Sequence, residues 1–85
     1  MPMIVDRDRN IASIFGANLR AALEKQGKTA YWLMKTLDAT RGAIYPIVRG
    51  ESHPSLGLAY RIAGALDTTV EELLKAPKKK SRFQT

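Results

Sequence analysis

The sequence predicts an all-α fold of five short helices, and three observations support this prediction. Apolar residues recur at spacings of three and four along most of the chain, which is the period of a helix with one buried face. No segment shows the alternation of apolar and polar residues that is typical of a half-buried strand. Four of the periodic segments follow a residue whose side-chain oxygen can cap the first backbone N–H groups of a helix. These residues are Thr29, Thr40, Ser55 and Thr69.

Length and composition fit one small domain. The chain has 85 residues, of which 45% are hydrophobic, and this share is too high for a fully disordered protein. It contains no cysteine, which excludes disulfides and thiolate metal sites and suits a reducing compartment. Its apolar runs are far shorter than the roughly 20 residues that span a membrane, and its first residues carry charges where a secretory signal is apolar. We therefore expect a cytoplasmic protein.

The positive charge is concentrated near the C-terminal end. The whole chain carries a formal charge of +6, but residues 75–82 supply five of its 14 positive side chains. Residues 1–74 carry nine positive and eight negative side chains, so the expected folded part is almost neutral. Only a local cluster of cations on one face could attract nucleic acid there.

The two ends of the chain differ from its middle. Residues 1–10 combine Met, Pro and closely spaced charges without a helical period, and we expect an N-terminal arm. The folded domain is expected over residues 11–76. It begins with a helix over residues 11–26 that stops at Gly27, which can take the left-handed conformation. Residues 77–85 are expected to form a flexible basic tail.

Four shorter helices are expected, one behind each capping residue. Glu72 follows Thr69 at the spacing of a capping box. Trp32 is predicted on the outer side of the second helix, packed on Ile4 and Val5 of the arm or on a partner subunit. The residues predicted to face the core are Ile14, Phe15, Leu19, Ala22, Leu23, Ala30, Leu33, Met34, Leu37, Ile44, Ile47, Val48, Leu58, Ile62, Ala65 and Leu66.

The second and third predicted helices form a candidate helix-turn-helix over residues 29–49. Only Asp38 and Ala39 separate the second helix from the Thr40 cap of the third. Two short amphipathic helices joined by so tight a turn pack at a steep angle with their apolar faces inward. The first turn of the later helix then projects outward, and a helix of this width fits the major groove of DNA.

An ordered set of residues extends this pattern over residues 13–75. Within the motif it comprises Thr29, Leu33, Leu37, Ala39, Thr40, Ile44, Arg49, Gly50, Pro54 and Ser55, and outside it Phe15, Gly16, Leu19, Arg20, Leu58, Ile62, Ala63, Ala65, Leu66 and residues 70–74. This order resembles the Cro/C1-type (XRE) helix-turn-helix family. The resemblance implies a compact five-helix, lambda-repressor-like DNA-binding domain of bacterial or phage origin. It also implies a sequence-specific transcriptional regulator, a repressor that binds a palindromic operator as a homodimer.

Several positions depart from the family pattern. Ala30 replaces a usual Gln, so one DNA contact is missing, and Val48 replaces a common Glu. Asp38 replaces the turn Gly, but Asp tolerates a left-handed backbone better than most residues. Pro46 lies inside the predicted third helix, where it removes one hydrogen bond and costs about 3 kcal/mol in a regular helix. That helix is expected either to be short or kinked after its first turn, or to restart as a second segment at Pro46.

Base contacts are predicted from the first turns of the third helix. Arg41 occupies its first exposed position, and arginine can bond to guanine O6 and N7 with two hydrogen bonds. Gly42 and Ala43 are small enough for a close approach to the groove, and a thymine methyl is a partner for Ala43. The Tyr45 hydroxyl reaches a base or phosphate, or else its ring packs on the neighbouring helix.

Phosphate contacts are predicted from six residues of two kinds. Three lie at helix starts or in the following loop, where backbone amides can hold an anion, and three are cations. The alternative is simple helix capping for the first kind and a solvated surface position for the second, with Arg49 also open to a structural role. The six residues are Thr29, Thr40, Ser52, Lys28, Lys35 and Arg49.

The remaining expectations concern partners. A homodimer contact is expected at Val70, Leu73 and Leu74. No metal, other cofactor or enzymatic activity is expected, because His53 is the only histidine and no nucleophile with a partnering base is evident. The alternative function is that of an antitoxin-type protein whose main role is to bind a partner protein, since the resembled family includes such proteins.

Overall fold

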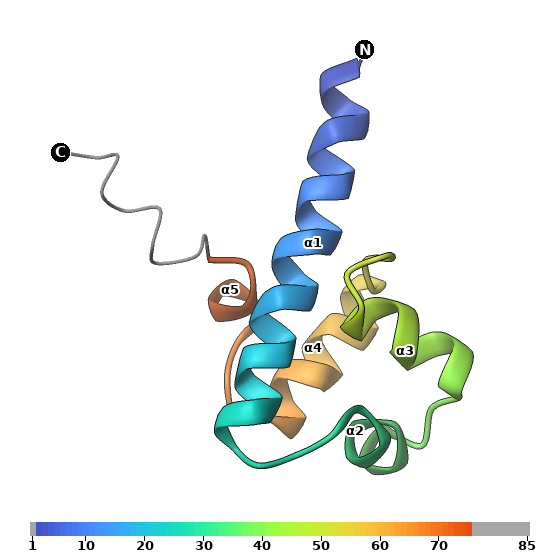
Figure 1. Cartoon of the computed structure of the whole chain (residues 1–85), viewed down its shortest axis with the longest axis vertical. Coiled ribbons are helices and arrows are strands. Elements are labelled where there is room, and N and C mark those ends of the chain that lie inside the picture. The colour runs from blue at the N-terminus through green and yellow to red at the C-terminus, as the bar shows by residue number, and fades with distance from the viewer. Residues whose placement is uncertain (1, 76–85) are drawn as a thin grey trace, which may run out of the picture.

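The computed structural model describes the backbone of residues 2–75 and the side chains of residues 11–75. Within these residues it contains helices and no strand, which confirms the predicted all-α class. Figure 1 shows the long α1 at the centre, with α3 on one side of it and α5 on the other. The tail predicted over residues 77–85 lies outside the described residues. The helices are α1 (Pro2–Lys25), α2 (Ala30–Leu37), α3 (Arg41–Val48), α4 (Leu56–Ala65) and α5 (Val70–Leu73).

The four shorter helices begin at the residues that the sequence predicts as caps. In each case the side-chain hydroxyl accepts a hydrogen bond from the backbone N–H three residues further on, which satisfies a donor that the helix cannot use. The carboxylate of Glu72 pairs with the ammonium of Lys75 at 3.2 Å, so the second half of the predicted capping box is not formed among the described residues. The capping pairs are Thr29 with Trp32 (3.0 Å), Thr40 with Ala43 (3.2 Å), Ser55 with Leu58 (3.2 Å) and Thr69 with Glu72 (3.1 Å).

The prediction of an N-terminal arm is wrong for residues 2–10, because α1 begins at Pro2 and continues for 24 residues. Proline is well tolerated in the first turn of a helix, and neither Gly nor Pro interrupts the chain again before Gly16. The packed part of α1 already supplies the unfavourable nucleus of a helix, and each further residue adds one hydrogen bond. The helix therefore extends without an apolar stripe, and Figure 1 shows its first turns projecting beyond the other helices.

The core lies where the apolar faces of the five helices meet. Of the predicted core residues that are only half-buried, Ile14 and Ala30 are not part of this packing, and those that pack against the core are Ala22, Met34, Val48, Leu58 and Ala65. Leu73, predicted at a dimer contact, is only 3% exposed, so its side chain belongs to the core of one chain and that prediction is wrong. Ala59 and Ala63 are buried although the apolar period did not select them, because small residues let α4 approach its neighbours. The fully buried predicted residues are Phe15, Leu19, Leu23, Leu33, Leu37, Ile44, Ile47, Ile62 and Leu66.

Long-range hydrogen bonds fix the C-terminal ends of the four shorter helices. The last carbonyl groups of a helix have no partner within it. Here the C-terminal end of each shorter helix accepts a hydrogen bond from a side chain of another part of the fold. The donor belongs to α1, to Gln26 directly after α1, or to α4. Such bonds set how the helices lie against one another. They are Arg61 to the Leu37 carbonyl (2.6 Å), Arg20 to Val48 (2.7 Å), Gln26 to Leu66 (2.8 Å), and Asn18 to Leu73 and Lys75 (2.7 and 2.8 Å).

Replacing Asn18 by alanine is expected to lower the free energy of unfolding by about 1–2 kcal/mol, since two carbonyl groups at the end of α5 lose their donor. Asn18→Asp is expected to be at least as damaging, because a carboxylate can only accept. Urea unfolding followed by far-UV circular dichroism measures both, with the exposed Glu24→Ala on the same helix as the control. An unchanged urea midpoint for Asn18→Ala would contradict this account.

Candidate nucleic-acid interface

A tight turn joins α2 to α3, as the sequence predicts. Asp38 ends α2 with φ 55° and ψ 45°, the left-handed conformation that aspartate tolerates better than most residues. The N–H of Asp38 donates to the Lys35 carbonyl and that of Ala39 to the Met34 carbonyl, at 3.2 and 3.0 Å. Arg61 of α4 holds the neighbouring Leu37 carbonyl. The turn is therefore fixed both by its own backbone and by α4.

α3 is one helix of eight residues that runs through Pro46, and not two separate segments. The carbonyl that an N–H at this position would bond belongs to Gly42, which is exposed, so water can satisfy it. Ile44 and Ile47 hold the helix from inside, with 0% and 4% of their surfaces exposed. Packing against the core thus offsets the missing hydrogen bond.

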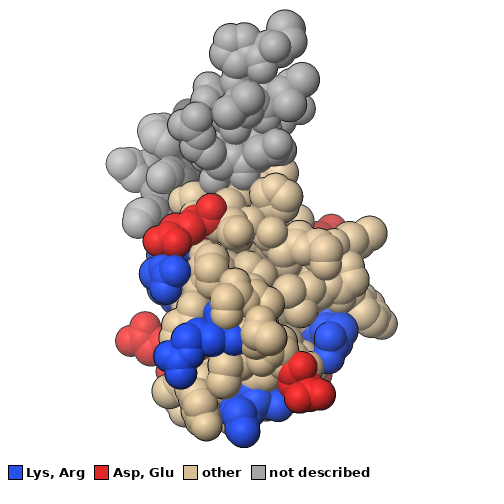
Figure 2. All heavy atoms as spheres, turned by 90° about the vertical axis from the view of Figure 1, so that its right-hand side faces the viewer, with Lys and Arg blue, Asp and Glu red and all other residues tan. Residues whose placement is uncertain are grey.

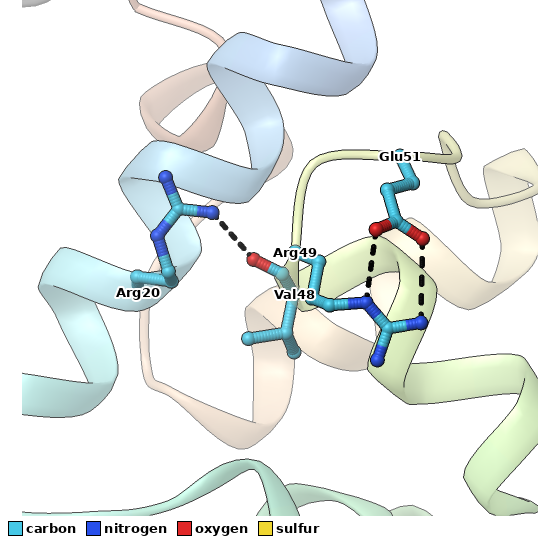
Figure 3. Close-up of polar contacts among 4 residues, drawn as sticks. All are labelled: Arg20, Val48, Arg49 and Glu51. Carbon is cyan, nitrogen blue, oxygen red and sulfur yellow. Dashed lines mark hydrogen bonds and ion pairs between the residues drawn. The ribbon is translucent and has the colours of Figure 1, made fainter.

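The end of α3 lies directly against α1. A Cβ atom placed on Gly16 would lie 2.6 Å from the Cα of Gly50 and 2.9 Å from the Ile47 carbonyl oxygen, so only glycine permits this approach. Figure 3 shows Arg20 of α1 reaching the Val48 carbonyl at 2.7 Å. One end of α3 is therefore anchored, and its first turn is the end that projects.

The residues predicted to contact bases lie on this projecting end. Arg41, Gly42 and Ala43 are all exposed. The guanidinium of Arg41 lies over the ring of Tyr45, 5.2 Å from its centroid. Tyr45 is half-buried, because its ring also packs on the hydrophobic core. Its ring thus has the packing role that the sequence left as an alternative, and it also supports Arg41.

Three of the predicted DNA-contacting cations lie over aromatic rings. A cation within about 6 Å of a ring centroid is attracted to the ring, by about 0.5–1 kcal/mol at exposed sites. In the pairs within α2 and α3 the cation and its ring are four residues apart, a spacing that brings side chains together on a helix face, whereas Lys28 lies just before the Thr29 cap of α2. This spacing is the signal that sequence reasoning missed. The pairs are Lys28 over Trp32 (4.3 Å), Lys35 over Tyr31 (5.9 Å) and Arg41 over Tyr45 (5.2 Å).

Trp32 has a neighbour that its sequence context did not predict. It is half-buried against the core, and Lys28 covers its ring. The predicted partners Ile4 and Val5 have side chains outside the described residues. Trp32 therefore serves within this chain as a support for Lys28.

The other residues predicted to contact phosphates differ in whether their side chains already have a partner within the chain. Thr29 and Thr40 are exposed and cap α2 and α3, and Ser52 is exposed in the loop after α3. Arg49 forms a two-bonded ion pair with Glu51, at 3.1 and 3.3 Å (Figure 3). Because the carboxylate of Glu51 already occupies its guanidinium, a phosphate would have to compete for Arg49.

Charge is scattered over the side of the molecule that carries α3. Figure 2 shows separate groups of Lys and Arg on this side, with acidic side chains among them and wide uncharged areas between. No helix of residues 2–75 is long and apolar enough to span a membrane. Among residues 11–75, whose side chains the structure describes, no three His, Asp or Glu side chains lie together as metal ligands do. Because the charges on this side are scattered, the candidate interface depends on a few separately placed cations and not on a continuous positive surface.

Comparison with known proteins establishes the fold of the chain. No protein-family model and no curated protein matches it. Its structure is similar to the crystal structure of a hypothetical transcription factor, NHTF, from Neisseria, with a TM-score of 0.74. The two chains are 18% identical, and the match covers 86% of this chain and 84% of that one. The same arrangement of helices therefore extends over most of both chains, while membership of the Cro/C1-type family stays a prediction.

Proposed function

We propose that this protein is a transcriptional regulator that reads double-stranded DNA by placing the first turn of α3 in the major groove. The observation that carries the proposal is the construction of α3. Its N-terminal turn is exposed, and its other end is anchored to α1 through Gly16 and Arg20. A reading element needs both features, because a base contact requires a protruding side chain on a rigid support. The shared fold with a protein described as a hypothetical transcription factor supports the proposal.

The exposed residues have two different roles in the proposed binding, which are base contact and phosphate contact. Arg41 is placed to bond to a base edge, and the small Gly42 and Ala43 allow α3 to approach the bases closely. Lys28 and Lys35, held over their rings, contact phosphates and set the orientation of α3. The free N–H groups at the starts of α2 and α3 add further phosphate donors.

The finer form of the proposal follows from the resemblance to the Cro/C1-type family. The protein acts in the cytoplasm of a bacterium, or of a phage-infected one, as a repressor that occludes a promoter. It binds a palindromic operator as a homodimer, with half-sites about one helical turn of DNA apart. The scattered charge in Figure 2 supports dependence on base contacts, because non-specific binding relies on many cations.

Selection from a pool of random duplexes tests this function whatever the target sequence is. The chain is used to retain duplexes over several rounds at physiological salt, and the retained sequences are compared with those retained by the protein-free matrix. We expect one motif with two inverted half-sites to be enriched. Retained duplexes with no common sequence would refute sequence-specific reading, and a single unrepeated half-site would refute the palindromic form.

A further inference from the structure

A two-bonded ion pair lies directly after α3, at the start of the loop that leads to α4. Gly50 takes a left-handed conformation with φ 81°, and the backbone N–H groups of this turn donate to carbonyls of α3. The turn brings Glu51 back toward Arg49. The Nε and Nη2 groups of Arg49 donate to the two carboxylate oxygens of Glu51 at 3.1 and 3.3 Å, as Figure 3 shows. The backbone at the end of α3 therefore holds the two side chains together.

The carboxylate of Glu51 occupies the guanidinium in the way that a phosphate would. A guanidinium bonds a carboxylate or a phosphate through the same two parallel N–H donors. The edge of Arg49 that carries Nε and Nη2 therefore binds one of the two anions at a time. The two side chains are 54% and 60% exposed, so an anion from outside can reach this edge. Because an ion pair this exposed is weak in water, one anion can replace the other.

Arg49 lies at the distance from the first turn of α3 that separates the middle of a DNA groove from its edge. A helix of eight residues is about 12 Å long. The major groove of B-DNA is about 12 Å wide, and the phosphates run along its two edges. If the first turn of α3 contacts bases, its last residues therefore come close to a phosphate backbone. Arg49 is the residue directly after α3, so its guanidinium is placed to meet a phosphate.

We propose that Glu51 competes with DNA phosphates for Arg49 and thereby limits the attraction of the protein to DNA of any sequence. In the free protein the carboxylate cancels the charge that Arg49 would offer. In the complex a phosphate replaces the carboxylate, and the released Glu51 stays beside the negative DNA backbone. Both effects weaken binding, and neither depends on the bases, because phosphates carry no sequence information. The inference rests on the proposed function for the placement of Arg49, but it does not require that Arg41 reads a base.

Arg49 differs in this respect from the other cations that are predicted to contact DNA. Lys28, Lys35 and Arg41 lie over aromatic rings, whereas Arg49 lies against a carboxylate. A ring attracts a cation without cancelling its charge, and a carboxylate cancels it. Three of these four cations therefore present a full charge to DNA. Because so few cations are involved, neutralising Glu51 should change the affinity for DNA measurably.

Glu51→Gln tests the competition, because it removes the negative charge and keeps the size of the side chain. We expect the affinity to rise roughly fivefold at about 0.1 M salt, for the selected motif and for a shuffled duplex alike. The slope of log affinity against log salt should steepen by about one, because Arg49 then releases a counterion from DNA while no freed carboxylate takes one up. Fluorescence anisotropy measures both quantities, and thermal unfolding verifies the fold.

Glu71→Gln is the matched control, because it makes the same change in net charge at an exposed position of α5. In Figure 1, α5 lies on the other side of α1 from α3. Charges are largely screened beyond about 10 Å at this salt concentration. The control should therefore leave the affinity and its salt dependence almost unchanged. A gain from Glu71→Gln equal to that from Glu51→Gln would overturn the proposal.

Arg49→Ala decides whether Glu51 acts through Arg49. Without a guanidinium to compete for, Glu51→Gln should raise the affinity by less than twofold. The same gain with and without Arg49 would overturn the proposal, because Glu51 would then act by its charge alone. A wild-type chain that prefers the motif but gains nothing from Glu51→Gln would overturn this inference alone. A gain that depends on Arg49 in a chain without motif preference would overturn sequence reading alone, and a chain that binds no duplex would overturn both.

Discussion

Arg41→Ala is expected to weaken binding to the selected DNA motif by roughly tenfold to a hundredfold while leaving the fold intact. A two-bonded arginine–guanine contact contributes about 1–3 kcal/mol of discrimination. Arg41 is exposed at the first position of α3, and its guanidinium makes no hydrogen bond or ion pair with another described residue, so its loss leaves no buried group without a partner. Fluorescence anisotropy with labelled duplexes measures the affinity, and thermal unfolding verifies the fold.

Two further variants separate base reading from charge. Arg41→Lys keeps the charge but removes the two-pronged donor, so it should retain non-specific binding and lose most of the preference for the motif. Lys75→Ala removes one cation beyond α5, on the other side of α1 from α3, and should have little effect on that preference. Equal effects of Arg41→Ala and Lys75→Ala would contradict the role of Arg41 in base reading.

Gly16→Ala is expected to destabilise the protein by about 3 kcal/mol, which is the upper end of the range for overpacking a core. The added Cβ would lie 2.6 and 2.8 Å from the Cα and N of Gly50 and 2.9 Å from the Ile47 carbonyl oxygen. All three atoms belong to the backbone, so no side chain can move aside. α1 and α3 must separate, and the hydrogen bond from Arg20 to Val48 should be lost with them.

A second glycine provides the matched control. At Gly57 of α4 an added Cβ would have no atom within 4 Å, so Gly57→Ala should stabilise the protein slightly, by about 0.5 kcal/mol. Urea unfolding of both variants gives the comparison. Similar stability of Gly16→Ala and the wild type would show that α1 and α3 do not approach as closely as described.

The helices were predictable because their signals are local. The cap at Thr29 and the apolar spacing of α2 lie within a few residues of each other, and the same holds for α3 and α4. The start of α1 was not predictable in this way, because residues 2–10 extend a helix whose stability comes from packing further along. Side-chain bonds such as that of Asn18 to the end of α5 join residues more than 50 positions apart, and no short pattern reveals them.

In the candidate site, too, some features follow from the local sequence and others depend on contacts between distant segments. The exposed position of Arg41 followed from its place after the Thr40 cap, which is local information. The pairing of Lys35 with Tyr31 is also readable from their four-residue spacing within α2. The burial of Leu73 was not readable, because α5 is a single turn whose inner face is decided by contact with α1.

The central claim is that α3 reads DNA sequence, and its most direct test is the ratio of affinities for the selected motif and a shuffled duplex at two salt concentrations. Anisotropy titrations at about 50 and 200 mM salt should show both affinities falling steeply, because phosphate contacts release counterions. The account predicts that the motif stays preferred by roughly a thousandfold at the higher salt. Equal affinity for the two duplexes at both salt concentrations would show that only charge attracts the protein to DNA and would contradict the account.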